Sequence, residues 1–152
     1  MVNLSLHNFM LEALEMANTA FKNNEVPVGA IVVKDGKVIG KGSNQVINNY
    51  SVSSHAEINA INDASQTLKN YRLNNCDIYV TLEPCHMCAK AIIDARINHL
   101  YFGAMEPKTG AVQSIDNFFD HSHLNHKVSY SGGHMKEPSA LLLKKFFQLR
   151  RG

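Results

Sequence analysis

Residues 77–104, DIYVTLEPCHMCAKAIIDARINHLYFGA, decide the fold of this chain of 152 residues. Asp77–Leu82 is an apolar run typical of a buried strand, and Asn98–Ala104 is a second run of the same kind. The stretch Cys85–Ala95 between them has the length of a helix, and Pro84 suits a first helical turn. A strand, a helix and a strand in this order predict a βαβ unit with parallel strands.

The segments before this unit predict two helices and two further strands. Apolar residues within 6–21 recur on one stripe of an amphipathic helix. The apolar runs 28–33 and 37–42 are separated by Lys34-Asp35-Gly36, a sequence typical of a hairpin turn, so these strands are expected to be antiparallel. A polar stretch then leads to a helix at His55–Leu68.

After the βαβ unit, the sequence predicts a long loop, one short strand and a last helix. The loop covers 105–126 with a short helix at Gln113–Phe119, the strand covers Lys127–Ser131, and the helix covers Pro138–Arg150. Alternating helices and strands favour an α/β fold, here a three-layer α/β/α sandwich around a five-stranded mixed sheet. The length suits a single domain over residues 1–152.

Composition excludes several classes of protein. A net charge of +2 is too mild to identify a nucleic-acid binder by itself. The three cysteines do not form a disulfide framework, which favours a reducing compartment, and Cys76 is expected to be a buried, inert thiol. Residues 1–20 lack a basic start and an uninterrupted apolar run, and no segment has membrane-spanning length, so we expect a cytoplasmic protein without membrane association.

Two short motifs carry the chemistry. His55-Ala56-Glu57 and Pro84-Cys85-His86-Met87-Cys88 supply three zinc-type ligands and a carboxylate. Three protein ligands leave one coordination position for water, as in catalytic zinc sites. Both motifs open helices, whose N-termini gather at the carboxyl ends of parallel strands and favour thiolates. We therefore expect Zn²⁺ at His55, Cys85 and Cys88, with Glu57 as proton carrier.

Each motif also has a structural alternative. Ser54-x-x-Glu57 fits a capping box, in which Glu57 only satisfies the start of its helix. Cys85 and Cys88 could form a redox pair or half of a structural zinc site, although no second Cys-x-x-Cys or His-x-x-x-His completes four ligands. The remaining histidines close to the motifs or in the long loop are predicted not to bind a metal: His86, His121, His123 and His126.

Segments along nearly the whole chain are similar to one known family. They are Glu25–Ala30, Asn44, His55–Glu57, Tyr71–Leu73, Thr81–Cys85, Lys108–Gly110, Asn125–His126, Phe146–Phe147 and Arg150–Arg151. With the metal motifs, they resemble the bacterial tRNA adenosine deaminases. The resemblance implies a cytidine-deaminase-like fold, a homodimer with one zinc ion per subunit, and hydrolytic deamination of the wobble adenosine of tRNA(Arg) to inosine. Glu57 would serve as both base and acid.

The resemblance also implies how an anticodon stem-loop is bound. Asn44 would bind the flipped base, in a pocket shaped by Pro27, Val28 and Ala56. Contacts to the RNA would come from Glu106, Lys108, Asn125, Phe147 and Arg150. Glu106 stands where the family usually has Asp, so its carboxylate reaches one methylene further. The resemblance therefore does not determine whether Glu106 makes this contact to the RNA or what preference for RNA over DNA results.

Three alternatives concern the substrate and the last helix. A deaminase of a free base or nucleotide, such as guanine, cytosine or deoxycytidylate, shares the metal motif. A zinc-stabilised RNA-binding module would use the same ligands without catalysis. The basic C-terminal segment also fits an ordinary amphipathic helix with Leu142, Phe146 and Leu149 toward the core.

Overall fold

The computed structural model describes residues 4–151. Its elements are α1 (Leu4–Lys22), β1 (Gly29–Lys34), β2 (Lys37–Ser43), α2 (Ala56–Leu68), β3 (Cys76–Leu82), α3 (His86–Asp94), β4 (His99–Ala104), the 3-10 turn η1 (Phe118–Asp120), β5 (Ser129–Ser131) and α4 (Lys136–Arg151). The predicted strands and the long helices are confirmed, with ends that differ from the prediction by a residue or two. No helix among residues 4–151 is long and apolar enough to cross a membrane.

The five strands form one mixed sheet in the order β2-β1-β3-β4-β5. β1 is antiparallel to both β2 and β3, whereas β4 is parallel to β3 and β5. The β1–β2 hairpin closes at Gly36, whose φ of 76° lies in the left-handed region that glycine tolerates. α2 thus connects two strands of the same direction across β1, and α3 connects the adjacent pair β3 and β4. The predicted βαβ unit and mixed sheet are confirmed.

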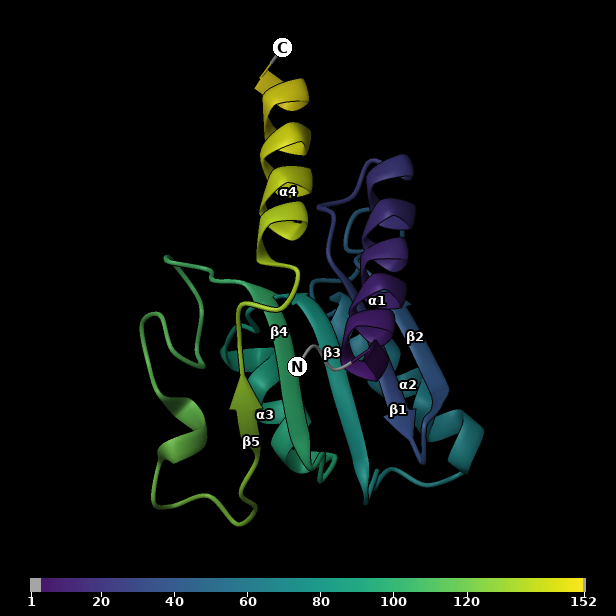
Figure 1. Ribbon diagram of the computed structural model, residues 1–152, viewed down its shortest axis with the longest axis vertical. Coiled ribbons are helices and arrows are strands. Elements are labelled where there is room, and N and C mark those ends of the chain that lie inside the picture. The colour runs from purple at the N-terminus through teal and green to yellow at the C-terminus, as the bar shows by residue number, and fades with distance from the viewer. Residues whose placement is uncertain (1–3, 152) are drawn as a thin grey trace.

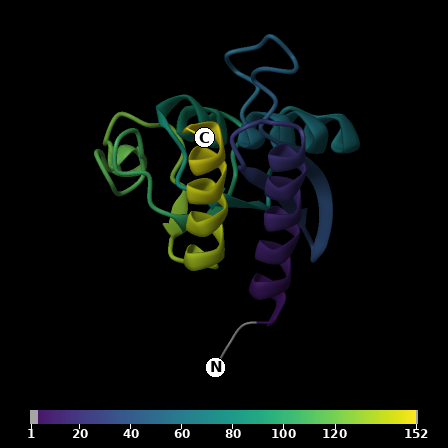
Figure 2. The ribbon, with the colours of Figure 1, turned by 90° about the horizontal axis from the view of Figure 1, so that it is seen from above.

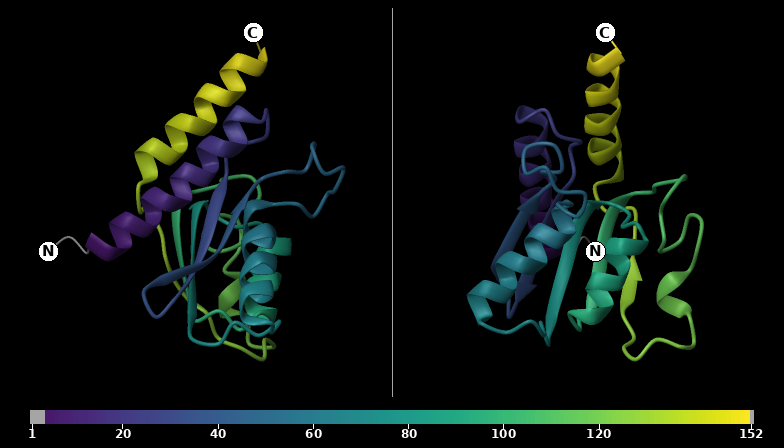
Figure 3. Two further views of the ribbon diagram at one scale, coloured as in Figure 1. Left: turned by 90° about the vertical axis from the view of Figure 1, so that its right-hand side faces the viewer. Right: turned by 180° about the vertical axis from the view of Figure 1, so that it is seen from behind.

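Helices cover both faces of the sheet, as the three-layer prediction requires. α1 and α4 lie on one face and α2 and α3 on the other (Figures 1 and 3). Successive side chains of each strand point to opposite faces of the sheet. Leu100 and Phe102 belong to the larger core cluster, which includes α2 and α3, whereas Tyr79 and Ile31 pack with Met10 of α1. Seen from above, α4 runs beside α1 (Figure 2).

The last helix extends beyond the sheet (Figure 1). Phe146 is buried, with its ring centroid 6.0 Å from that of Phe21 in α1. Leu142 is half-buried, but Leu149 is 65% exposed, so the alternative in which Leu149 faces the core is wrong at that residue. The periodicity of the helix is as expected, but at Leu149 the helix has passed the edge of the core.

The long loop between β4 and β5 differs from the prediction. A helix at Gln113–Phe119 is wrong, because only the turn η1 forms there. The backbone amides of Val112, Gln113 and Ser114 donate to the carboxylate of Glu83. Farther along, the amide of Asn117 donates to the side chain of Asp116 and that of Phe118 to the carbonyl of Ala111, not to the carbonyls four residues earlier that a helix requires.

Candidate metal centre and substrate pocket

The three predicted metal ligands meet at the start of α2 and α3. His55 is the N-cap residue of α2, and Cys85, three residues after the end of β3, is the N-cap residue of α3. Nδ1 of His55 lies 3.7 Å from Sγ of Cys85 and 3.4 Å from Sγ of Cys88. The ligand atoms of all three residues lie within 4.8 Å of one another. The fold thus brings together two motifs that are separated by a helix and a strand.

The geometry of this cluster fits zinc. Zinc bonds of about 2.3 Å to sulfur and about 2.0 Å to nitrogen, at a tetrahedral angle, hold the two ligand atoms about 3.5 Å apart. The two observed distances between His55 Nδ1 and the sulfurs, 3.4 and 3.7 Å, lie on either side of that value. A ligand set of one imidazole and two thiolates suits zinc and leaves one coordination position open.

The two thiols do not behave alike. A hydrogen bond from Cys88, assisted by His55, lowers the pKa of Cys85 to about 3. The same hydrogen bond, together with burial, raises the pKa of Cys88. Of the two sulfurs, Cys85 therefore ionises more readily, and Cys88 keeps its proton. Binding of a metal requires both sulfurs deprotonated and would release that proton.

Glu57 lies next to the ligands and is almost fully buried. Glu57 is 4% exposed, and burial raises the pKa of its carboxyl group to about 7. A hydrogen bond from its own backbone N–H and the nearby His55 lower this pKa, but by less than burial raises it. A carboxyl group with a pKa near neutrality can both accept and return a proton. The capping-box alternative is wrong, because the N-cap residue is His55 and the hydroxyl of Ser54 donates to Asn59 instead.

A pocket of about 280 Å³ opens onto Glu57 and His55. This volume is close to the lower end of the range for small-molecule sites, about 300–1,000 Å³, and suits a single planar base. Two of the residues expected at the base, Val28 and Asn44, line it. The other two, Pro27 and Ala56, are buried beside lining residues in the sequence. The sequence did not predict four further lining residues: Glu25, Val26, Val46 and Ile47.

One wall of the pocket is a loop between β2 and α2, which projects from the body of the protein (Figure 3). Its neck is closed by a hydrogen bond of 2.9 Å from the amide of Gln45 to the carbonyl of Ser54. Inside it, the buried carboxylate of Glu25 accepts from the amides of Ile47, at 3.2 Å, and Asn48, at 2.7 Å. The apolar wall is therefore fixed by a carboxylate that lies more than one element away in the sequence.

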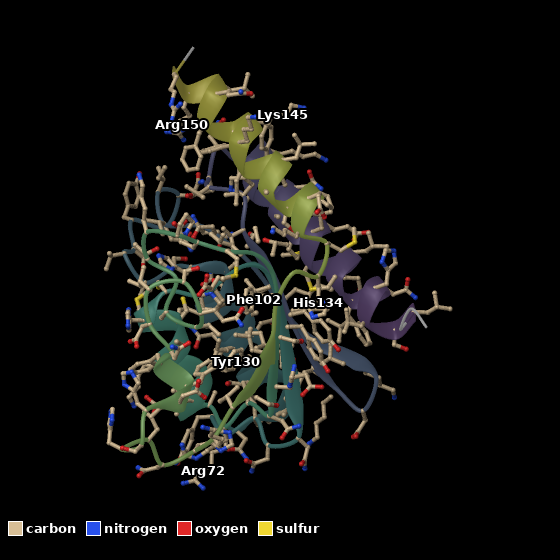
Figure 4. All side chains as sticks on the ribbon, turned by 60° about the vertical axis from the view of Figure 1, so that its left-hand side comes forward. Arg72, Phe102, Tyr130, His134, Lys145 and Arg150 are labelled. Atoms are coloured by element: carbon tan, nitrogen blue, oxygen red, sulfur yellow. The ribbon has the colours of Figure 1, made fainter. Side chains whose placement is uncertain are left out.

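The expected RNA-binding residues lie on a second loop, the one between β4 and β5, and on α4. On the loop, Glu106 accepts a hydrogen bond of 3.0 Å from the amide of Lys108, while Lys108 and Asn125 are exposed. On α4, Phe147 is 44% exposed. Arg150 donates to the carbonyl of Asn24 at 2.6 Å and is labelled near the end of the helix in Figure 4. These five residues do not form one cluster, because three lie on the loop and two lie on α4.

Glu83 holds that second loop. Its buried carboxylate accepts from the amides of Glu106, Val112, Gln113 and Ser114 and from the hydroxyl of Ser114. Burial opposes its ionisation, but these hydrogen bonds outweigh burial and lower the pKa of Glu83. Nothing in the spacing of the sequence indicated this role.

Three other histidines, His86, His121 and His126, have partners away from the ligand cluster. Nε2 of His86 lies 2.8 Å from a carboxylate oxygen of Asp116, and Nε2 of His121 lies 3.0 Å from the other oxygen. His126 donates to the carbonyl of Ile97 at 2.7 Å. His86 thus points away from the cysteines, as predicted. Cys76 is fully buried, also as predicted.

The fold and this site define a deaminase: residues 5–151 match the family model described as MafB19-like deaminase. The chain is 45% identical over 143 residues to the tRNA-specific adenosine deaminase of Haemophilus influenzae, covering 93% of this chain and 83% of that protein. It is 42% identical over 142 residues to the enzyme of the same name from Aquifex aeolicus, covering 93% and 94%. The chain therefore belongs to the family of tRNA-specific adenosine deaminases.

Solved structures agree with this assignment. One, from work on A-to-I editing by tRNA deaminases at the wobble position of transfer RNA, superposes with a TM-score of 0.86 at 44% identity, covering 89% of this chain and 98% of that one. Guanine deaminase from Bacillus subtilis gives a TM-score of 0.63 at 28% identity, covering 95% and 93%. The predicted deaminase fold is confirmed, and the ligand cluster occurs in it as expected.

Proposed function

We propose that this protein is a zinc-dependent enzyme that converts the wobble adenosine in the anticodon of tRNA(Arg) to inosine. The observation that carries the proposal is the position of buried Glu57 between the His55, Cys85 and Cys88 cluster and a pocket that suits a single base. The relatives named tRNA-specific adenosine deaminase support the substrate class.

Zinc, held by His55, Cys85 and Cys88, supplies a nucleophilic water at neutral pH when it is bound. The protein supplies the rest. Glu57 removes a proton from the attacking water and delivers protons to the adenine ring nitrogen and to the departing ammonia. Burial of Glu57 keeps bulk water from competing for that proton. The amide of Asn44, which lines the pocket, is suited to hydrogen bonds with the edge of the base.

A base can enter this pocket only after leaving its stack. The pocket suits a single base, and bases in single-stranded loops are extruded at low cost. The stem-loop would then contact Glu106, Lys108 and Asn125 on one side. On the other side it would meet Phe147 and Arg150, whose helix extends beyond the sheet (Figure 4).

We further propose a homodimer with one zinc ion per subunit, working in the cytoplasm where its tRNA substrate is found. Light scattering at micromolar protein concentration measures the number of chains per particle. A mass of two chains is expected from the 16.9 kDa chain, and a single chain would contradict it. Metal analysis of the same sample should give one zinc ion per chain.

The direct test of the substrate is a parallel assay. The purified protein is incubated with an anticodon stem-loop that carries adenosine at the wobble position, and separately with guanine, cytosine and deoxycytidylate. We expect inosine in the stem-loop and no ammonia from the small substrates. Release of ammonia from a small substrate, with no inosine in the stem-loop, would make the protein a free-base or nucleotide deaminase. Guanine is included because the guanine deaminase structure is 28% identical to this chain.

A further inference from the structure

Glu83 is a buried carboxylate that no step of the proposed reaction uses. It is 2% exposed, lies two residues before Cys85, and receives five hydrogen bonds from the loop 106–114. One oxygen accepts from the amide of Glu106 at 3.0 Å and from the hydroxyl of Ser114. The other accepts from the amides of Val112, Gln113 and Ser114, at 3.1, 2.7 and 2.9 Å.

These donors match a carboxylate and little else. An ionised carboxylate offers about four lone-pair sites and no donor, so five converging donors saturate it. A glutamine here has to turn its NH₂ group toward one of the two sets of donors. The less costly orientation faces the amide of Glu106 and the hydroxyl of Ser114, because the other orientation would leave three amides without an acceptor.

The loop is shaped around this carboxylate. A Cβ atom at Gly110 would collide with the carboxylate of Glu83 and with the carbonyl of Glu106, so only glycine fits there. The amide of Gly110 donates to the carbonyl of Glu106 at 2.8 Å, and the amide of Ala111 donates to the carbonyl of Pro84 at 2.9 Å. Segment 106–114 is thereby fastened to the two residues that immediately precede the ligand Cys85.

We propose that Glu83 is a positioning residue for the RNA substrate: it fixes the loop that carries Glu106 and Lys108 at the edge of the metal centre. The inference rests on the proposed function, because it gives this loop the task of contacting the stem-loop. Glu83 is neither among the lining residues of the pocket nor in the ligand cluster. Its contribution is to remove the loop's conformational freedom before the RNA arrives, which lowers the entropy lost on binding.

Two substitutions break the same contact from opposite sides. Glu83→Gln removes an acceptor, and Gly110→Ala forces the loop away from the carboxylate. Ser114→Ala removes only the hydroxyl and leaves the four amides in place, so it is the mild variant that folds even where the other two do not. Glu12→Gln, which loses only a long ion pair of 3.9 Å between α1 and Lys41, is the control for loss of a carboxylate away from this loop.

Each variant is purified with its zinc and assayed in two ways. Kinetics on the anticodon stem-loop give kcat and KM separately, and fluorescence anisotropy in a Glu57→Ala background gives the Kd for the RNA without turnover. We expect Glu83→Gln and Gly110→Ala to raise KM and Kd about tenfold, with a smaller change in kcat. Ser114→Ala should raise both about two- to threefold, and Glu12→Gln should leave them unchanged.

Zinc content decides between positioning of the RNA loop and support of the metal ligands. One zinc ion per chain in every variant, with the rise in Kd, supports the proposal. Loss of zinc in proportion to the loss of activity would overturn it, since Glu83 would then act on Cys85. Unchanged Kd in all three variants, with a parent enzyme that forms inosine, would also overturn it. A parent enzyme that forms no inosine counts instead against the proposed function.

Discussion

Glu57 should make the stability of the chelator-treated, zinc-free protein depend on pH. Burial raises its pKa from 4.5 to about 7, so between these values the folded chain holds a proton that the unfolded chain has lost. Protonated Glu57 therefore contributes stability in full below about pH 4.5, and this contribution disappears as the pH rises through about 7. At one unit of pKa per 1.36 kcal/mol, the whole effect is roughly 3 kcal/mol.

The assay is urea unfolding of the zinc-free protein at pH 5 and at pH 8, beside the same measurement on Glu57→Gln. Glutamine keeps the shape of a protonated carboxyl and cannot ionise, so it should escape the loss. We expect the free energy of unfolding of the parent to fall by about 2–3 kcal/mol more than that of Glu57→Gln over this interval. Parallel curves for the two proteins would refute the reasoning, because other titrating groups, Cys85 included, are common to both.

Three further predictions test the site and the last helix. Glu57→Ala should lower kcat on the stem-loop at least about 100-fold while one zinc ion per chain remains, which metal analysis and inosine formation measure together; loss of zinc would show a structural role instead. Cys85→Ser should lose both zinc and activity, because a hydroxyl does not replace a thiolate ligand, and activity that survives without zinc would contradict the ligand set. Phe146→Ala should cost about 3 kcal/mol of stability in urea unfolding, since Phe146 is buried, whereas Leu149→Ser, exposed on the same helix, should change stability by less than about 0.5 kcal/mol; equal losses would mean that α4 is buried along its whole length.

The features that the sequence predicted correctly depend on local patterns. The strands β3 and β4 are apolar runs on either side of a helix, and this pattern alone imposes parallel pairing. The metal ligands were predicted from the residue types and spacing of two motifs, and they meet because His55 and Cys85 both open helices, whose starts converge at one end of such a sheet.

The features that it missed depend on contacts between distant residues. The helix expected at Gln113–Phe119 is absent where the loop folds around the carboxylate of Glu83, far earlier in the chain, and the amide of Phe118 donates back to the carbonyl of Ala111. The pocket wall at Val46 and Ile47 was missed for the same reason, since Glu25 sets the shape of that loop. Periodicity also says nothing of where a core ends, so the exposure of Leu149 near the end of α4 could not be foreseen.

Nucleoside analysis of the tRNA itself tests the central claim most directly. Full-length tRNA(Arg) with adenosine at the wobble position is treated with the zinc-loaded protein, digested, and mapped by mass spectrometry, with Glu57→Ala as the control. The account predicts inosine at the wobble position, up to one per tRNA, with every other adenosine intact and no inosine from the control. Unchanged adenosine at the wobble position, under conditions where the same preparation releases ammonia from a free base, would contradict it.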